Sequence, residues 1–119
     1  MTTRIPTITP RPGGALNTIL ISWIGLLNGD NGTAWEGADF ADRTAQVLGT
    51  FGAGGSINLE GSNDGTNWAP LTDPQGNAIT KTAASIEYVS ELPRFIRPNV
   101  TAGDGTTNLT LTVFGRRSR

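Results

Sequence analysis

The side chains that most often carry out chemistry near neutral pH are missing from this chain. Its 119 residues include no histidine and no cysteine. Histidine has an unperturbed pKa in the physiological range, and cysteine thiolate is a common nucleophile and zinc ligand. The composition therefore argues against an enzyme. We expect no catalytic residues, no metal site and no cofactor.

Carboxylates are the remaining candidates for chemistry. Asp30, Asp64 and Asp104 each lie beside glycine in short polar stretches. None has the twelve-residue spacing and terminal glutamate of a calcium hand, so we interpret all three as turn residues. Glu36 and Asp39 could in principle act as a glycosidase pair, but nothing in the sequence holds them across a cleft.

Charge is distributed unevenly along the chain, although the formal net charge is only −1. The central part carries all ten carboxylates against four basic residues, a balance of −6, whereas the two ends together carry +5. Such ends are suited to an acidic neighbouring surface. Because the central part would repel phosphate, we expect no direct contact with nucleic acid. The basic residues of the ends are Arg4, Arg11, Arg116, Arg117 and Arg119.

The N-terminal segment predicts an extended arm. Residues 1–14 contain three prolines, which exclude a regular helix and favour polyproline-like backbone. Ile5 and Ile8 are three residues apart and fall on one side of such an arm, so we expect them to dock on a partner. The arm should have no backbone partners in the isolated chain. We place the packed domain at 15–115 and a basic tail at 116–119.

Alternating apolar residues predict strands in the packed domain. Between 107 and 114, Leu109, Leu111 and Val113 alternate with polar residues and should face inward. Residues 18–27 are apolar on both alternating faces, which predicts a strand covered on both sides. The longest apolar run, residues 19–27, is under half the ~20 residues that a membrane-spanning helix needs, so we expect no membrane contact.

Turn signals complete the prediction of the fold. The stretch 63–67, with Asp-Gly at its centre, is typical of a hairpin. Seven or eight short strands at roughly ten-residue spacing indicate an all-β protein, a single antiparallel β-sandwich with jelly-roll or Greek-key-like connections and the extended N-terminal arm. The irregular stretch 28–42 contains Trp35, which we predict to lie at an interface.

Two sequence elements carry a resemblance to a known class of proteins. Residues 59–71, LEGSNDGTNWAPL, and residues 93–100, PRFIRPNV, together with a strand ending in two arginines, resemble small structural proteins of tailed-bacteriophage heads. The resemblance implies a virion structural protein, a capsid decoration (cement) protein that binds the major capsid protein on the outer surface of the capsid, stabilises the phage head and forms a homo-oligomer.

An alternative remains open at this point. The element GSNDGTNW is also similar to discoidin-like sandwiches, which bind sugars or lipids. That resemblance implies a carbohydrate-binding or host-adhesion module of a phage tail or capsid surface. In the decoration-protein interpretation, the residues expected to contact the capsid or a neighbouring subunit are Arg4, Ile5, Ile8, Arg11, Trp35, Arg116, Arg117 and Arg119.

Overall fold

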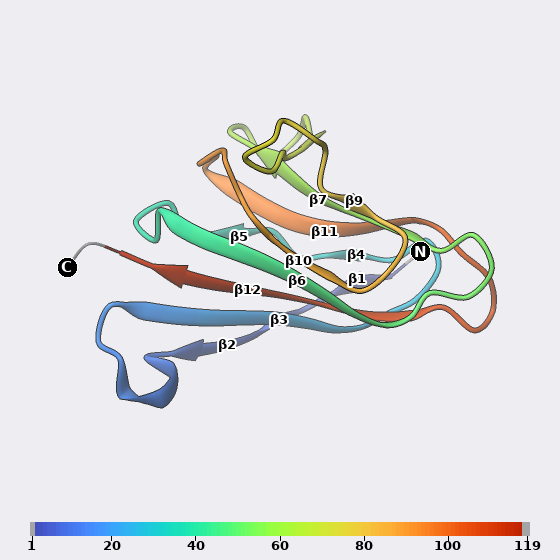
Figure 1. The fold of residues 1–119 in the computed structure, drawn as a ribbon, viewed down its shortest axis with the longest axis horizontal. Coiled ribbons are helices and arrows are strands. Elements are labelled where there is room, and N and C mark those ends of the chain that lie inside the picture. Colours follow the sequence, from blue (N-terminus) through green and yellow to red (C-terminus); the bar gives the residue numbers. More distant parts are fainter. Residues whose placement is uncertain (1, 118–119) are drawn as a thin grey trace.

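Two β-sheets packed face to face form the protein (Figure 1). The structure is a computed structural model and describes residues 2–117. Its elements are β1 (Thr3–Arg4), β2 (Thr7–Pro10), the short 3-10 turn η1 (Pro12–Gly14), β3 (Thr18–Leu26), β4 (Asn31–Gly32), β5 (Trp35–Glu36), β6 (Asp42–Thr50), β7 (Ser56–Ser62), β8 (Ala69–Pro70), β9 (Thr80–Lys81), β10 (Ser85–Tyr88), β11 (Phe95–Ala102) and β12 (Asn108–Arg116).

The strand order confirms the predicted all-β sandwich. One sheet has five strands in the order β10-β6-β12-β3-β2. The other has the order β1-β4-β11-β7-β8, with β5 also paired to β11 and β9 to β7. After β3 the chain passes back and forth between the sheets, and the last strand, β12, returns beside β3. This is the connectivity of a jelly roll.

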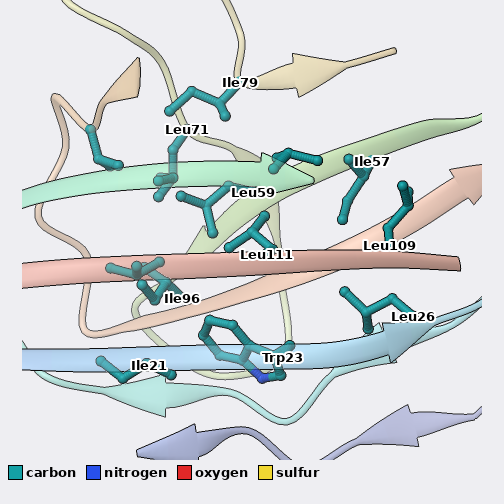
Figure 2. Packing of buried hydrophobic residues seen from close by; sticks show 14 of the residues in the cluster. Ile21, Trp23, Leu26, Ile57, Leu59, Leu71, Ile79, Ile96, Leu109 and Leu111 are labelled. Carbon is teal, nitrogen blue, oxygen red and sulfur yellow. The ribbon is translucent and has the colours of Figure 1, made fainter. Parts of the chain in front are cut away.

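Strand β12 is the centre of the five-stranded sheet and organises the core. It pairs antiparallel with β3 on one side and with β6 on the other, which leaves alternate side chains facing the second sheet. Leu109, Leu111 and Val113 are fully buried, as their spacing predicts. Figure 2 shows Leu109 and Leu111 packed among residues of both sheets, including Trp23 of β3 and Leu59 of β7.

The prediction that strand 18–27 is covered on both sides is wrong. Ile21 and Trp23 are fully buried, but Ile24 is 62% exposed on the outer face. Gly25 has a φ of +74°, and the pairing register with β12 shifts at this point. This irregularity returns Leu26 to the core, so Leu26 is buried although it has the same parity as exposed Ile24. The apolar outer face of β3 therefore lies at the surface.

The N-terminal segment is extended as predicted, but it has backbone partners in the body. β1 pairs in parallel with β4 in one sheet, and β2 pairs antiparallel with β3 in the other. The segment thus lies along an edge of each sheet, because both edges offer unpaired backbone groups. η1 then leads into β3; Arg11 and Gly13 there have positive φ values of 53° and 67°, which turn the chain back. The expectation of an unpartnered arm is therefore wrong.

Candidate interaction surface

The outer face of the five-stranded sheet is the most distinctive surface of the protein. Among the described residues of its strands, the charged side chains that point outward are Asp42 and Arg116, at one end. At all other positions of the face listed below, the outward side chains carry hydroxyl, amide or apolar groups. We call this surface the uncharged face. Its residues are Thr7, Thr9, Leu20, Ser22, Ile24, Thr44, Gln46, Leu48, Ile86, Tyr88, Thr110, Thr112 and Phe114.

Large apolar side chains gather on the uncharged face. Five of them are between 38% and 62% exposed, and they come from four neighbouring strands. Single exposed apolar residues are ordinary, but a group of them on one flat face is typical of a protein contact surface. Threonine and serine fill the space between them, and Ser22 and Thr112 hydrogen-bond each other at 3.0 Å. The five apolar residues are Ile24, Leu48, Ile86, Tyr88 and Phe114.

A hollow of about 170 Å³ lies at one end of this face. Thr44 pairs with Tyr88 of β10 on one side and with Phe114 of β12 on the other, so the two aromatic side chains lie on either side of the hollow. Asp42 closes the end of the hollow: it accepts hydrogen bonds from the Tyr88 hydroxyl at 3.3 Å and from Arg116 at 3.0 Å. An apolar side chain of a partner could insert between the two rings, as interface anchors commonly do.

The outer side of the seven-stranded sheet has the opposite character. Glu60, only 7% exposed, accepts hydrogen bonds from Arg97 at 3.2 Å and from Asn99 at 3.0 Å. The Arg97 guanidinium also lies 4.2 Å from the centre of the Trp68 ring. This sheet therefore covers its own apolar and charged groups with a polar network, whereas the five-stranded sheet leaves its outer side open.

The three candidate calcium-loop aspartates act as structural acceptors. The backbone and side chain of Asn67, the amide of Thr66 and the hydroxyl of Ser62 all donate to Asp64, which holds its pKa well below the usual range. The amide of Ala53 and the groups of Thr106 lower the pKa of Asp104 to about 2.

These oxygens are therefore already engaged within the turns. No group of three or more acidic, histidine or cysteine side chains that could hold a metal occurs within residues 2–117.

Asp30 fastens the N-terminal segment to the body. It is 4% exposed and accepts hydrogen bonds from the Leu27 amide at 2.9 Å, the Thr2 amide at 3.0 Å and Arg4 Nε at 3.1 Å. Burial works against ionisation of this carboxyl, but the two amides and the guanidinium hold its pKa below the ordinary value. Arg4 is thus ion-paired with Asp30 within the protein, which makes its charge less available to a partner.

Three of the predicted contact residues lie at exposed positions of the N-terminal segment. Ile5 is 84% exposed and Ile8 is 49% exposed. The Arg11 side chain is also exposed and has no hydrogen-bond or ion-pair partner among the described residues. These three remain predicted contact residues.

The C-terminal arginines are paired within the protein. Arg116 contacts Asp42 at 3.0 Å, and Arg117 lies 3.5 Å from Asp39 and 5.3 Å from the centre of the Phe40 ring. Arg119 lies outside the described residues. Because both described side chains already have carboxylate partners, they are less available to an acidic neighbour than the sequence suggests.

Trp35 is a core residue, so its prediction as an interface anchor is wrong. It is 8% exposed, and β5 places it opposite Ile96 of β11. Phe40 lies against it with a ring-centre distance of 6.3 Å, and a Cβ on Gly37 would come within 2.0 Å of the indole. The irregular stretch therefore folds inward and closes an end of the sandwich, a role for which aromatic side chains have enough area.

Sequence reasoning missed the five apolar residues of the uncharged face. The signal that could have found them is the alternation of inward and outward side chains in β6 and β10. Leu48 lies at an outward position in β6 once Ala45 and Val47 are assigned to the core. Ile86 and Tyr88 alternate in the same way in β10. Apolar residues at outward positions of several strands of the same sheet would have indicated a contact surface.

The chain was compared with known families, curated proteins and solved structures. No family model and no curated protein matches the chain. Among solved structures it is similar to peruvianin-I, a cysteine peptidase from Thevetia peruviana latex, with 17% identity, a TM-score of 0.46 and coverage of 96% of this chain and 63% of that one. It is similar to cobalt(II) HppE in complex with Tris buffer, with 15% identity, a TM-score of 0.47 and coverage of 92% and 51%.

KdgF from Halomonas sp. is a further similar structure, with 12% identity, a TM-score of 0.44 and coverage of 94% of this chain and 77% of that one. The chain spans less than two thirds of the peptidase and of HppE. At these identities the likeness is no evidence of enzymatic activity. Within the described residues, no helix is long and apolar enough to cross a membrane.

Proposed function

We propose that the chain is a capsid decoration protein. It binds the major capsid protein on the outer surface of a bacteriophage head and stabilises the assembled shell as a virion structural protein. The proposal joins the resemblance of residues 59–71 and 93–100 to phage head proteins with one structural observation, the uncharged face. A binding role of this kind requires no catalytic group or cofactor.

The uncharged face supports the proposal because it is suited to binding another protein. Removing a charged side chain from water is costly, whereas hydroxyl and apolar groups are desolvated at much lower cost. Ile24 and Ile86 are among the most exposed apolar residues of the sheet. Burying such a side chain fully contributes roughly 1.5–3 kcal/mol. A few such contacts, with an anchor in the hollow beside Phe114, would hold each copy.

The N-terminal segment would add a second contact. Ile5 and Ile8 are exposed at an edge of the sandwich, and the Arg11 side chain has no ion-pair partner within residues 2–117. We assign these residues to contact with a neighbouring copy, which would make the protein a homo-oligomer on the shell. Because Arg4, Arg116 and Arg117 are ion-paired within the chain, the dependence of binding on salt should be modest.

Stabilisation of the head would follow from preferential binding. A protein that binds the assembled shell more tightly than the separated subunits shifts the equilibrium toward the shell by mass action. Each copy that bridges two capsid subunits contributes to this shift, and the contributions add over the many equivalent sites of a shell. A decoration protein is therefore expected in many copies on a particle, whereas a tail adhesion module is expected in few.

The test is reconstitution on particles. Virions that carry this chain are stripped of it, mixed with purified protein, and sedimented, and the bound copies are counted by quantitative mass spectrometry. Wild-type protein should rebind in high copy number. Leu48→Lys, which places a charge on the uncharged face, should bind at least about tenfold more weakly, a loss of about 1.4 kcal/mol or more.

Thr80→Lys provides the matched control, because Thr80 is an exposed strand residue of the other sheet. Both variants should unfold at the same denaturant concentration as the wild type, since both positions are exposed. Equal binding by Leu48→Lys and Thr80→Lys would place the contact elsewhere. Rebinding of only a few copies per particle would contradict a decoration role and favour the adhesion module.

A further inference from the structure

A cleft of about 430 Å³ lies in the seven-stranded sheet, away from the uncharged face. The end of β7 lies beside the start of β11 at one end of the sheet (Figure 1). The cleft is lined by the residues that follow β7 and those that precede β11. β8 and the residues before β11 complete its walls. Its size falls within the usual range for small-molecule sites. The lining residues are Gly61, Ser62, Asn63, Asn67, Ala69, Pro70, Leu71, Glu91, Leu92 and Pro93.

The cleft combines apolar walls with a polar rim. Leu71 is 5% exposed and belongs to the core, so it forms a rigid base. Gly61 packs directly against it: a Cβ at this position would lie 2.6 Å from both Leu71 and Pro93. Pro70 adds a further rigid apolar surface, while Asn63 and Asn67 lie on the rim. The lining therefore offers apolar surface for contact and polar groups for hydrogen bonds in similar measure.

The two rim amides are held in place and each has an unused end. Asn63 accepts the Arg94 amide through its oxygen at 3.0 Å, which leaves its NH₂ group without a partner among the described residues. Asn67 donates a hydrogen bond from its NH₂ group to Asp64 at 2.8 Å, and its side-chain oxygen has no hydrogen-bond partner among the described residues. The rim therefore offers one donor and one acceptor, and a sugar hydroxyl can satisfy either.

The charges around the cleft disfavour an anionic ligand. Glu91 accepts hydrogen bonds from the amide of Thr72 at 2.7 Å and from its hydroxyl, so its carboxylate is fixed in the charged form. Asp64 carries a second negative charge beside Asn67. Arg94 is paired with Glu36 at 2.6 Å, and the guanidinium of Arg43, which is 1% exposed, donates to the backbone oxygen of Glu91 at 2.7 Å from the interior of the sandwich. Among the described residues, the charged side chains exposed beside the cleft are therefore Glu91 and Asp64, whereas Arg43 is buried behind it and Arg94 is ion-paired.

From this geometry we propose that the cleft between β7, β8 and residues 91–93 is a binding site for neutral carbohydrate. The apolar walls contact the C–H surface of a sugar ring, and Asn63 and Asn67 hydrogen-bond its hydroxyl groups. The site does not depend on attachment to a capsid, because the uncharged face lies on the outer side of the other sheet. A protein bound through that face would keep the cleft open to solvent.

The experiment is a titration of ¹⁵N-labelled full chain followed by NMR. The probes are the methyl glycosides of glucose, galactose, mannose, rhamnose and N-acetylglucosamine at high millimolar concentration, with methyl galacturonide as an acidic counterpart of the galactoside. At least one neutral glycoside should shift the amide signals of residues 61–71 and 91–93. The galacturonide should shift them at least about tenfold less at equal concentration.

Ala69→Trp is the blocking variant, since Ala69 is an exposed wall residue and an indole there would fill the cleft. Ala84→Trp, at an exposed turn position outside the cleft, is its control. The shifts should disappear in Ala69→Trp and persist in Ala84→Trp. The inference is overturned if no neutral glycoside shifts these signals, if the shifts survive in Ala69→Trp, or if the acidic sugar binds as well as the neutral one.

Discussion

Replacing Asp30 with alanine should destabilise the whole domain, because this carboxylate joins the N-terminal segment to the turn between β3 and β4. The variant removes the common acceptor of the Leu27 amide, the Thr2 amide and Arg4 Nε. A hydrogen bond to a charged group contributes roughly 1.5–3 kcal/mol. Thr2 and Arg4 lie near the surface, so in the variant their donor groups can hydrogen-bond to water. The loss of stability should therefore be well below the sum of three such hydrogen bonds. We expect a loss of roughly 2–4 kcal/mol.

Urea unfolding, followed by tryptophan fluorescence, measures this loss. Asp39→Ala is the matched control: Asp39 is 67% exposed and its contact with Arg117 is 3.5 Å long. Exposed ion pairs contribute about 0–1 kcal/mol, so the control should be nearly as stable as the wild type. Hydrogen exchange should also show faster exchange in β1 of the Asp30→Ala variant, because the pairing of β1 with β4 depends on this anchor.

The pH dependence supplies an independent check. The folded-state pKa of Asp30 lies below its ordinary value near 3.8, so the unfolded chain binds this proton more readily than the folded one. The stabilisation is therefore fully present above about pH 4 and is lost as the pH falls through the folded-state value. The difference in stability between wild type and Asp30→Asn should shrink over that range. A loss below about 0.5 kcal/mol at pH 7, or a difference that grows on acidification, would refute the proposed role of this carboxylate.

Two further predictions concern the core and the turns. Leu111→Asp should unfold the domain, since an unpaired carboxylate at a fully buried position of β12 costs several kcal/mol, whereas Thr110→Asp on the outer face should leave a folded protein by circular dichroism. Addition of a chelator should not change the melting temperature, because Asp64 and Asp104 are satisfied by hydrogen bonds of their own turns; a drop of several degrees would assign a cation to one of these turns.

The long strands could be predicted from the sequence because their side chains carry the pattern. Leu109, Leu111 and Val113 alternate with polar residues, and the core requires one apolar face. The turn at 63–67 could be predicted equally well, since Asp64 accepts hydrogen bonds from the nearby backbone amides of Thr66 and Asn67. These features are local, so a single sequence contains them.

The remaining features depend on groups that a sequence pattern does not show. The N-terminal segment pairs through its backbone with β3 and β4, and the sequence does not specify which strand edge is free. Gly25 has a φ of +74°, and this turns the side chain of the following residue toward the core. The residue types around Gly25 do not predict this change. The prediction for Trp35 was wrong for a related reason. The polar residues around it suggested the surface, but its burial depends on Ile96, which is 61 positions away in the sequence.

The edges of the five-stranded sheet help explain why its face, rather than its edges, is the open surface. Pro10 ends the edge strand β2 and Pro6 precedes it, and proline lacks the amide that a further strand would need. On the other edge strand, β10, Glu87 points toward the interior and is held by Lys81 at 2.8 Å. Charged inward residues and prolines are known protections against edge pairing. With both edges protected and the central strands of the opposite sheet covered by the polar network around Glu60, the uncharged face is the broad surface on which a partner can bury apolar area at little desolvation cost.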